Sequence, residues 1–178
     1  MHGWNHESPV FAKLIERVKP KTIIEVGVWM GGSLCNMLDL ATDARAYAVD
    51  TWLGSLEFWK KDALGPERNL MIERGYPRCY DQFHSNLVHR GHVDRVDVIP
   101  LPSDIAAEVL ASRGIKADLI YIDASHEYKR VKADFESYLP LLSDAGILFG
   151  DDIGWPGIAK FIGEIKADIE DDKWIYKP

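Results

Sequence analysis

The regular alternation of strand-length apolar segments with helix-length amphipathic segments constrains the fold of this chain more than any other feature. The expected strands cover residues 22–27, 46–50, 93–99, 117–122 and 146–150, with a short last one at 173–176. The expected helices cover residues 9–19, 31–40, 79–90, 103–113, 127–142 and 156–169. Repeated alternation of this kind predicts an α/β fold with a doubly wound, mostly parallel, Rossmann-like sheet and helices on both faces.

The length and composition fit a single domain over residues 1–178. A net charge of −7 argues against a nucleic-acid-binding surface, which would need a basic face. No apolar run approaches membrane-spanning length, and the first residues lack the character of a signal peptide. Cys35 and Cys79 match no metal or redox spacing and are interpreted as reduced thiols, so the expected location is cytoplasmic.

Acidic residues follow two of the expected strands at ends that should meet. Asp123 ends the fourth strand, Asp151 and Asp152 follow the fifth, and His126 lies three residues after Asp123. The carboxyl ends of strands in an open parallel sheet form the ligand crevice. Clustered carboxylates suit a hard divalent cation such as Mg²⁺, and a nearby imidazole suits a proton acceptor. Each acid alone could instead cap a helix or turn a loop, but the whole set predicts a site.

The segment after the first strand, residues 25–33 (EVGVWMGGS), has the character of a ligand-binding loop. It departs from the Gly-x-Gly-x-x-Gly dinucleotide fingerprint because Trp29 occupies the middle glycine position. Its glycines let the backbone approach a ligand, and the following helix start offers amide donors to a carboxylate or phosphate. A carboxylate at Glu25 would repel a pyrophosphate but tolerate a cationic ligand; the alternative is a surface acid at a strand end.

Asp50, at the end of the second strand, is placed to bind a pair of ribose hydroxyls. A ligand that combines a ribose, no phosphate and a positive charge is S-adenosylmethionine. The loop and Asp50 therefore favour S-adenosylmethionine over a dinucleotide.

These residues together resemble the ordered motifs of class I S-adenosylmethionine-dependent methyltransferases, over roughly residues 20–165. The closer resemblance is to the metal-dependent O-methyltransferases, which include the catechol and the macrocin-type sugar enzymes. Histidine at 126 and aspartate at 152 resemble the sugar branch, since the catechol enzymes usually have lysine and asparagine there. The motifs are E-x-G-x-x-x-G-x-S at 25–33, Asp50, PSD at 102–104, D-x-x-Y-I-D at 118–123, D-A-S-H-x-Y at 123–128, L-L-x-x-x-G at 141–146, GDD at 150–152 and PG at 156–157.

The resemblance implies a role for each matched residue. Asp123, Asp151 and Asp152 would hold the divalent metal, and His126 would be the catalytic general base. The residues around S-adenosylmethionine would be Glu25, Gly27, Trp29, Gly31, Ser33, Asp50, Ser103, Asp104 and Asp123.

The expected function is therefore metal-dependent methyl transfer from S-adenosylmethionine to a small acceptor with neighbouring hydroxyls, a sugar rather than a catechol. The alternatives are a metal-independent methyltransferase, a non-catalytic S-adenosylmethionine-binding homologue and a dinucleotide oxidoreductase, the last disfavoured by Glu25 and Trp29. No nucleic-acid or membrane partner is expected, and the sequence is compatible with a homo-oligomer.

Two regions depart from the regular pattern. Residues 51–78 form an insertion that we interpret as a lid or substrate-recognition segment, partly helical near 57–61 and 67–73; a partner or oligomer surface is the alternative. A single strand is expected after the last helix, where the sheet of the resembling family normally ends in a two-strand hairpin. The C-terminal edge of the sheet is therefore expected to be shortened or completed by a partner chain.

Overall fold

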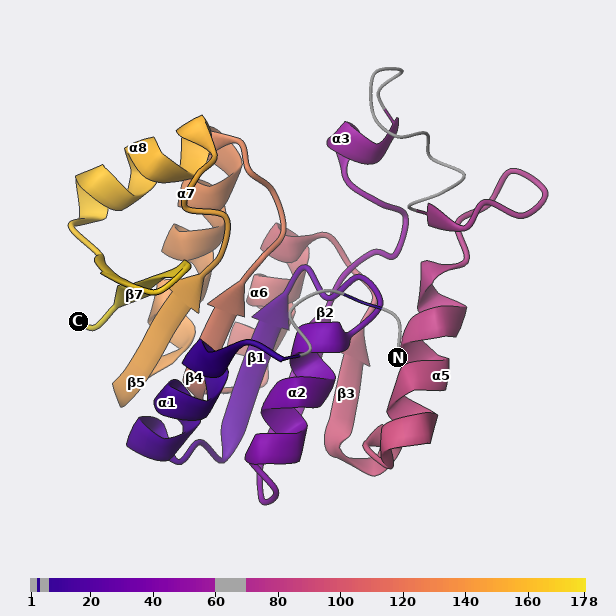
Figure 1. Cartoon of the computed structure of the whole chain (residues 1–178), viewed down its shortest axis with the longest axis horizontal. Helices are drawn as coiled ribbons and strands as arrows, with labels where there is room; N and C mark the ends of the chain where they lie inside the picture. The colour runs from indigo at the N-terminus through magenta and orange to yellow at the C-terminus, as the bar shows by residue number, and fades with distance from the viewer. Residues whose placement is uncertain (1–2, 4–6, 60–69) are drawn as a thin grey trace.

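The computed structural model describes residue 3, residues 7–59 and residues 70–178, and within these ranges seven strands form one sheet (Figure 1). The strand order is β3-β2-β1-β4-β5-β7-β6; the strands β1 to β5 pair in parallel, and β7 is antiparallel to both of its neighbours. The predicted doubly wound sheet is confirmed. The strands are β1 (Thr22–Val26), β2 (Arg45–Val49), β3 (Val96–Ile99), β4 (Ala117–Ile122), β5 (Leu142–Gly150), β6 (Asp168–Glu170) and β7 (Lys173–Tyr176).

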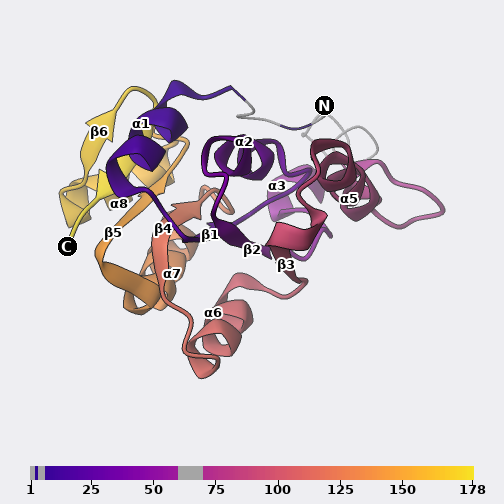
Figure 2. The same ribbon diagram turned by 90° about the horizontal axis from the view of Figure 1, so that it is seen from below.

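Helices cover both faces of the sheet (Figure 2). One face packs against α1, α2 and α5, and the other packs against α6, α7 and α8, so each face has its own apolar core. Along β1, Ile23 belongs to the first core and Ile24 to the second, which explains why the central strands are apolar at consecutive positions. The helices are α1 (Pro9–Val18), α2 (Gly32–Leu40), α3 (Leu56–Trp59), α5 (Cys79–Arg90), α6 (Ser103–Ser112), α7 (Tyr128–Tyr138) and α8 (Pro156–Ile165), with 3₁₀ turns η1 (Val93–Arg95) and η2 (Leu139–Leu141).

The expectation of a shortened C-terminal edge is wrong. The strands β6 and β7 form an antiparallel hairpin, and β7 pairs with β5 through Phe149 and Ile175. The sequence of β6, Asp168-Ile-Glu170, gave no strand signal because it is three residues long and two of its residues are exposed. The hairpin completes the sheet within the chain.

Element boundaries differ from the prediction at several places. The helix α8 ends at Ile165 and not at residue 169, and β6 follows it. Residues 93–95 form the 3₁₀ turn η1 before β3, and α7 ends at Tyr138, before Pro140. The strand β5 begins at Leu142 and not at Gly146, with a register irregularity in its pairing with β4. These differences lie at element ends, where local sequence signals are weakest.

The insertion at residues 51–78 is described in part. The helix α3 overlaps the one expected at 57–61, whereas residues 71–73 of the other expected helix are not helical and Glu73 pairs with Tyr76 in a turn. Leu70 is helical, and the rest of these two segments lies within 60–69, outside the described residues. Trp52 and Leu70 are buried in the core beside α5, so both ends of the insertion are anchored to the domain.

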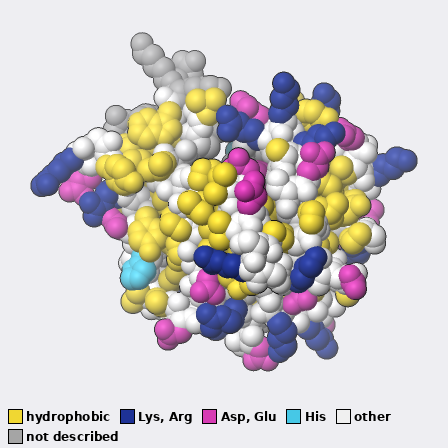
Figure 3. Space-filling model, turned by 180° about the vertical axis from the view of Figure 1, so that it is seen from behind, with side chains coloured by type: hydrophobic (Ala, Val, Ile, Leu, Met, Phe, Trp, Pro, Cys, Tyr) yellow, Lys and Arg dark blue, Asp and Glu magenta, His cyan; other side chains and the backbone are white. Residues whose placement is uncertain are grey.

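The surface shown in Figure 3 carries basic and acidic side chains intermixed, and its described residues form no continuous basic area. In the described part of the chain, none of the helices combines the length and the apolarity that crossing a bilayer requires.

We predict that Trp174→Ala lowers the free energy of unfolding by about 3–5 kcal/mol, because it removes a fully buried ring. This ring packs edge-on against Phe161 at 5.5 Å and lies directly against Gly150, so it fastens the terminal hairpin to the sheet. The control Ile169→Ala, at an exposed position of the same hairpin, should change stability by no more than about 0.5 kcal/mol. Urea unfolding of both variants measures the difference, and equal effects would contradict the anchoring role.

Candidate functional site

A cleft of about 1010 Å³ lies at the carboxyl ends of β1, β2, β4 and β5. It is lined by the loop after β1, by Asp50 and by the start of α6, and also by Asp123, His126 and Asp152. This volume is at the upper end for small-molecule sites, which leaves room for two ligands side by side. The cleft therefore brings together both groups of residues that the sequence singled out.

Two glycines shape the loop after β1. Gly27 has φ of +88°, and a Cβ there would lie 2.2 Å from the Asp123 carbonyl oxygen, so the loop approaches the end of β4 too closely for a side chain. Gly31 has φ of +74° and begins α2 against the ring of Phe83. Both glycines thus set the path of the loop, but Gly31 does not itself line the cleft.

Glu25 lies beneath this loop and does not line the cleft. Its carboxyl group is fully buried, and one oxygen accepts a hydrogen bond from the hydroxyl of Ser33, which does line the cleft. Burial, and to a smaller extent the nearby Asp123 and Asp50, raises the pKa of Glu25 well above its ordinary value. The other oxygen, Oε2, has no hydrogen-bond partner among the described residues, so a nearby cationic ligand would stabilise this acid in its charged form.

Asp50 organises the loop as well as facing the cleft. Its two carboxylate oxygens accept hydrogen bonds from the backbone amides of Trp29 and Trp52, both at 2.7 Å. These bonds hold Trp29 and Trp52 in left-handed conformations, with φ of +47° and +55°. The predicted contact between Asp50 and a ribose would have to share a carboxylate that already binds two amides.

The start of α6 meets α7 at the same cleft. Ser103 is the first residue of the helix and not its N-cap, and its hydroxyl donates a 2.5 Å hydrogen bond to Asp134. Asp134 is buried, and burial raises its pKa to about 6. The sequence prediction missed Asp134, although it lies on the core face of α7 between Val131 and Phe135. Charged residues are rarely buried, so an acid on the core face of a predicted helix could have indicated a functional role for Asp134.

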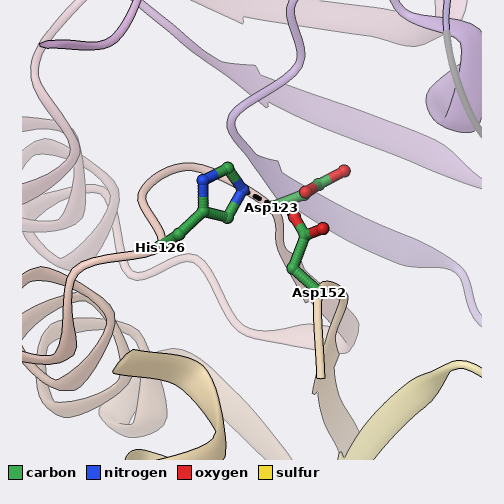
Figure 4. A group of neighbouring side chains, drawn as sticks. All are labelled: Asp123, His126 and Asp152. Carbon is green, nitrogen blue, oxygen red and sulfur yellow. Dashed lines mark ion pairs between the residues drawn. The ribbon is translucent and has the colours of Figure 1, made fainter. Parts of the chain in front are cut away.

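Asp123, His126 and Asp152 form a compact group (Figure 4). Each offers one ligand atom, and these atoms lie within 4.8 Å of one another. The His126 ring turns toward the two acids, and its Nε2 is 2.6 Å from Oδ2 of Asp152. Burial and the charges of Asp151 and Asp152 raise the pKa of Asp123 well above its ordinary value. Two carboxylates and one imidazole at this spacing suit a divalent cation.

Asp151 is separated from this group. Its Oδ1 lies 3.0 Å from the Nζ of Lys173 and accepts a 2.7 Å hydrogen bond from the backbone amide of Asp152, while its Oδ2 lies 3.1 Å from the Tyr121 hydroxyl. The expected group of three aspartates is therefore not the group that the structure brings together. Asp151 lines the same cleft but forms a salt bridge with the buried Lys173 of β7, and local sequence gave no sign of that partner.

Trp155 packs on His126 and sets the plane of its ring. The two rings stack at 4.5 Å with an interplanar angle of 13°, and Trp155 is 47% exposed at the edge of the cleft. Trp155 precedes Pro156 at the start of α8, so this helix fixes the position of the indole. A stacked tryptophan restricts the imidazole to orientations within this plane.

The sequence model of a family described as "Methyltransferase domain" matches residues 24–153. This range contains the loop after β1, Asp50, the start of α6 and the acidic group at the ends of β4 and β5. The uncharacterized protein y4gI from Sinorhizobium fredii (strain NBRC 101917 / NGR234) is 28% identical over 158 residues, which is 84% of this chain. The chain spans 15% of the length of that relative.

Solved O-methyltransferase structures share the fold. The O-methyltransferase from Bacillus cereus in complex with SAH has a TM-score of 0.67 and 18% identity, with 96% of this chain and 81% of that chain covered. The apo structure of CalS11, a TDP-rhamnose 3′-O-methyltransferase of calicheamicin biosynthesis, has a TM-score of 0.61 and 18% identity, with 94% and 77% covered. At these identities the similarity shows the architecture of the sheet and helices.

The buried acid Asp134 makes a pH-dependent contribution to stability. Its pKa is higher in the folded protein, about 6, than its ordinary value of 3.8, so folding favours the protonated form. The contribution is therefore present in full below about pH 4 and is lost as the pH rises to about 6. Asp134→Asn should remove this loss and stabilise the protein at pH 7 by on the order of 1–3 kcal/mol. Urea unfolding between pH 4 and 8 measures the difference.

The exposed residue Asp144 on β5 provides the control for this experiment. The curve for Asp144→Asn should run parallel to the wild-type curve. A wild-type minus Asp134→Asn difference that stays constant from pH 4 to 7 would contradict the raised pKa.

Proposed function

Since the chain belongs to the methyltransferase domain family, whose model matches residues 24–153, we propose that it transfers a methyl group from S-adenosylmethionine to a hydroxyl of a small acceptor. The observation that carries this proposal is the single cleft lined both by the loop after β1 and by the group Asp123, His126 and Asp152. The cofactor half of this cleft is formed by the loop after β1 and Asp50, and the acceptor half is formed by Asp123, His126 and Asp152. A methyl donor in the first half and an acceptor in the second would be adjacent. Alignment of two reactants in this way can lower a barrier by roughly 7–11 kcal/mol.

The cofactor half suits a cationic ligand without phosphates. The Glu25–Ser33 pair and Asp50 place buried acids beneath and beside the loop, which favours a sulfonium and an ammonium group over a pyrophosphate. Asp50 remains the proposed ribose contact, and Ser103 and Asp104 the residues beside the adenine. The amides at the start of α2 are available to the carboxylate of the methionine portion.

The acceptor half suits a divalent cation such as Mg²⁺. Asp123 and Asp152 would hold it, and the His126 ring lies beside them. When bound, such an ion lowers the pKa of an alcohol and orients neighbouring hydroxyls. Two hydroxyls on adjacent carbons match this chemistry, and both a sugar and a catechol offer them. The sugar-like diol is the proposed acceptor because histidine at 126 and aspartate at 152 resemble the sugar branch of the family. The TDP-rhamnose enzyme CalS11, which shares the fold, supports a sugar acceptor.

In this mechanism, His126 accepts the proton of the reacting hydroxyl. Its Nε2 faces the acidic group, and Asp152, at 2.6 Å, stabilises the imidazolium that forms. Trp155 keeps the ring in the plane needed for this transfer. The apolar walls of the cleft, among them Trp29 and Phe58, exclude water from the reacting groups.

Chelation tests the role of the cation. Turnover, measured as release of S-adenosylhomocysteine on a panel of vicinal-diol sugars and catechols, should fall below detection in EDTA and return with Mg²⁺. Calorimetric binding of S-adenosylmethionine should persist in EDTA, because the chelator removes the cation and leaves the loop after β1 and Asp50 in place. Undiminished turnover in EDTA would instead favour a metal-independent methyltransferase.

Replacement of His126 tests the base. His126→Ala should reduce kcat by about 10²–10⁴-fold on the best acceptor of the panel and leave the Kd for S-adenosylmethionine within about threefold. The matched control is His89→Ala, at an exposed position near the end of α5, which should behave as the wild type. A near-normal kcat for His126→Ala would assign the proton transfer to another group.

A further inference from the structure

The fully buried Lys173 lies directly behind the acidic group, and the proposed function does not use it. Its Nζ is 3.0 Å from Oδ1 of Asp151 and 2.5 Å from Oδ2 of Asp172. Lysines are rarely buried unless they are paired, because desolvation of the ammonium is costly. The terminal hairpin thus delivers a fixed positive charge to the carboxyl edge of the sheet.

Asp151 connects Lys173 to Asp152 directly and to Asp123 through Tyr121. The oxygen that binds Lys173 also accepts the 2.7 Å hydrogen bond from the backbone amide of Asp152. Asp152 has φ of +63°, a left-handed conformation that is unfavourable for a residue with a side chain. The Asp151 carboxylate therefore helps to hold the backbone turn that directs the Asp152 side chain toward Asp123 and His126 (Figure 4).

Tyr121 connects Asp151 to Asp123. Its hydroxyl lies between the second oxygen of Asp151, at 3.1 Å, and Oδ2 of Asp123, at 3.0 Å. The ring is fixed by stacking on Phe149 at 4.7 Å and by an edge contact with Phe11 at 5.3 Å.

We propose that Lys173, Asp151 and Tyr121 form a positioning network that presets Asp123 and Asp152 to hold a divalent cation. Asp151 acts in this network as the link between Lys173 and Tyr121 and not as a ligand of the ion. The inference rests on the proposed function, because it assumes that Asp123 and Asp152 bind a cation. Residues that orient ligating carboxylates through hydrogen bonds typically change metal affinity by 10–100-fold when removed.

The test measures Mn²⁺ binding by calorimetry or paramagnetic resonance, without cofactor, acceptor or turnover. The wild type should bind one ion, and Asp123→Asn should abolish this binding. Tyr121→Phe retains the ring contacts and loses the bridging hydroxyl, so its Kd should rise 10–100-fold. The control is Tyr138→Phe, which removes a buried hydroxyl that donates to the Ser103 carbonyl and should leave Mn²⁺ affinity unchanged.

Lys173→Met is expected to weaken Mn²⁺ binding and also to destabilise the fold, because it leaves the half-buried Asp151 beside other acids without its counter-charge. The double variant Lys173→Met/Asp151→Asn removes both charges and should recover stability in urea unfolding. If the network positions the ligands, its Kd for Mn²⁺ remains 10–100-fold above the wild-type value.

The outcomes separate the two proposals. A wild type that binds no Mn²⁺ overturns the metal-dependent function and the network with it. A wild type that binds Mn²⁺, together with Tyr121→Phe and double variants within threefold of it, overturns the network alone. If Tyr121→Phe keeps wild-type affinity while Asp151→Asn alone abolishes binding, Asp151 is a ligand and the positioning role is refuted.

Discussion

The site depends on backbone hydrogen bonds that continue the parallel pairing past the ends of the strands. The amide of Asp123 donates to the carbonyl of Val26 at 2.8 Å, and the amide of Gly27 donates to that of Val49 at 2.9 Å. These bonds hold the loops after β1, β2 and β4 at one edge of the sheet. Because residue 27 has no side chain, the Asp123 carbonyl occupies the space that a Cβ would need. The cofactor loop and the acidic group consequently line one cleft.

Concentrating acids at one buried edge carries an electrostatic cost, which the fold offsets in three ways. Ser33 donates a hydrogen bond to Glu25, and backbone amides donate to both oxygens of Asp50. Lys173 supplies a positive charge to Asp151 from the far end of the chain. The electrostatic cost is still evident at Asp123, whose pKa is raised by burial and by its acidic neighbours. A residue in this state is well suited to a cationic ligand.

The elements with a clear period were predictable from the sequence, and the contacts between distant elements were not. The strands β1 and β4 each contain a run of buried apolar residues shared between the two cores, so their assignment needed no tertiary information. The strand β6 was missed because three half-polar residues carry no period and form a strand only by pairing with β7. The structure brings Asp123 and His126 together, as the sequence led us to expect, whereas the pairing of Asp151 with Lys173, 22 residues further along the chain, could not be predicted from local sequence.

By itself, the sequence determined the class of the fold, the loop after β1 and the edge of the sheet at which the acids gather. Periodicity and glycine placement encode these features locally, since each depends on residues within one strand–loop–helix unit. The tertiary structure alone decided which acids face one another, that Tyr121 bridges two of them and that a buried lysine pairs with a third. The direction of a carboxylate is set by the charges and donors packed around it, and those come from parts of the chain far apart in sequence.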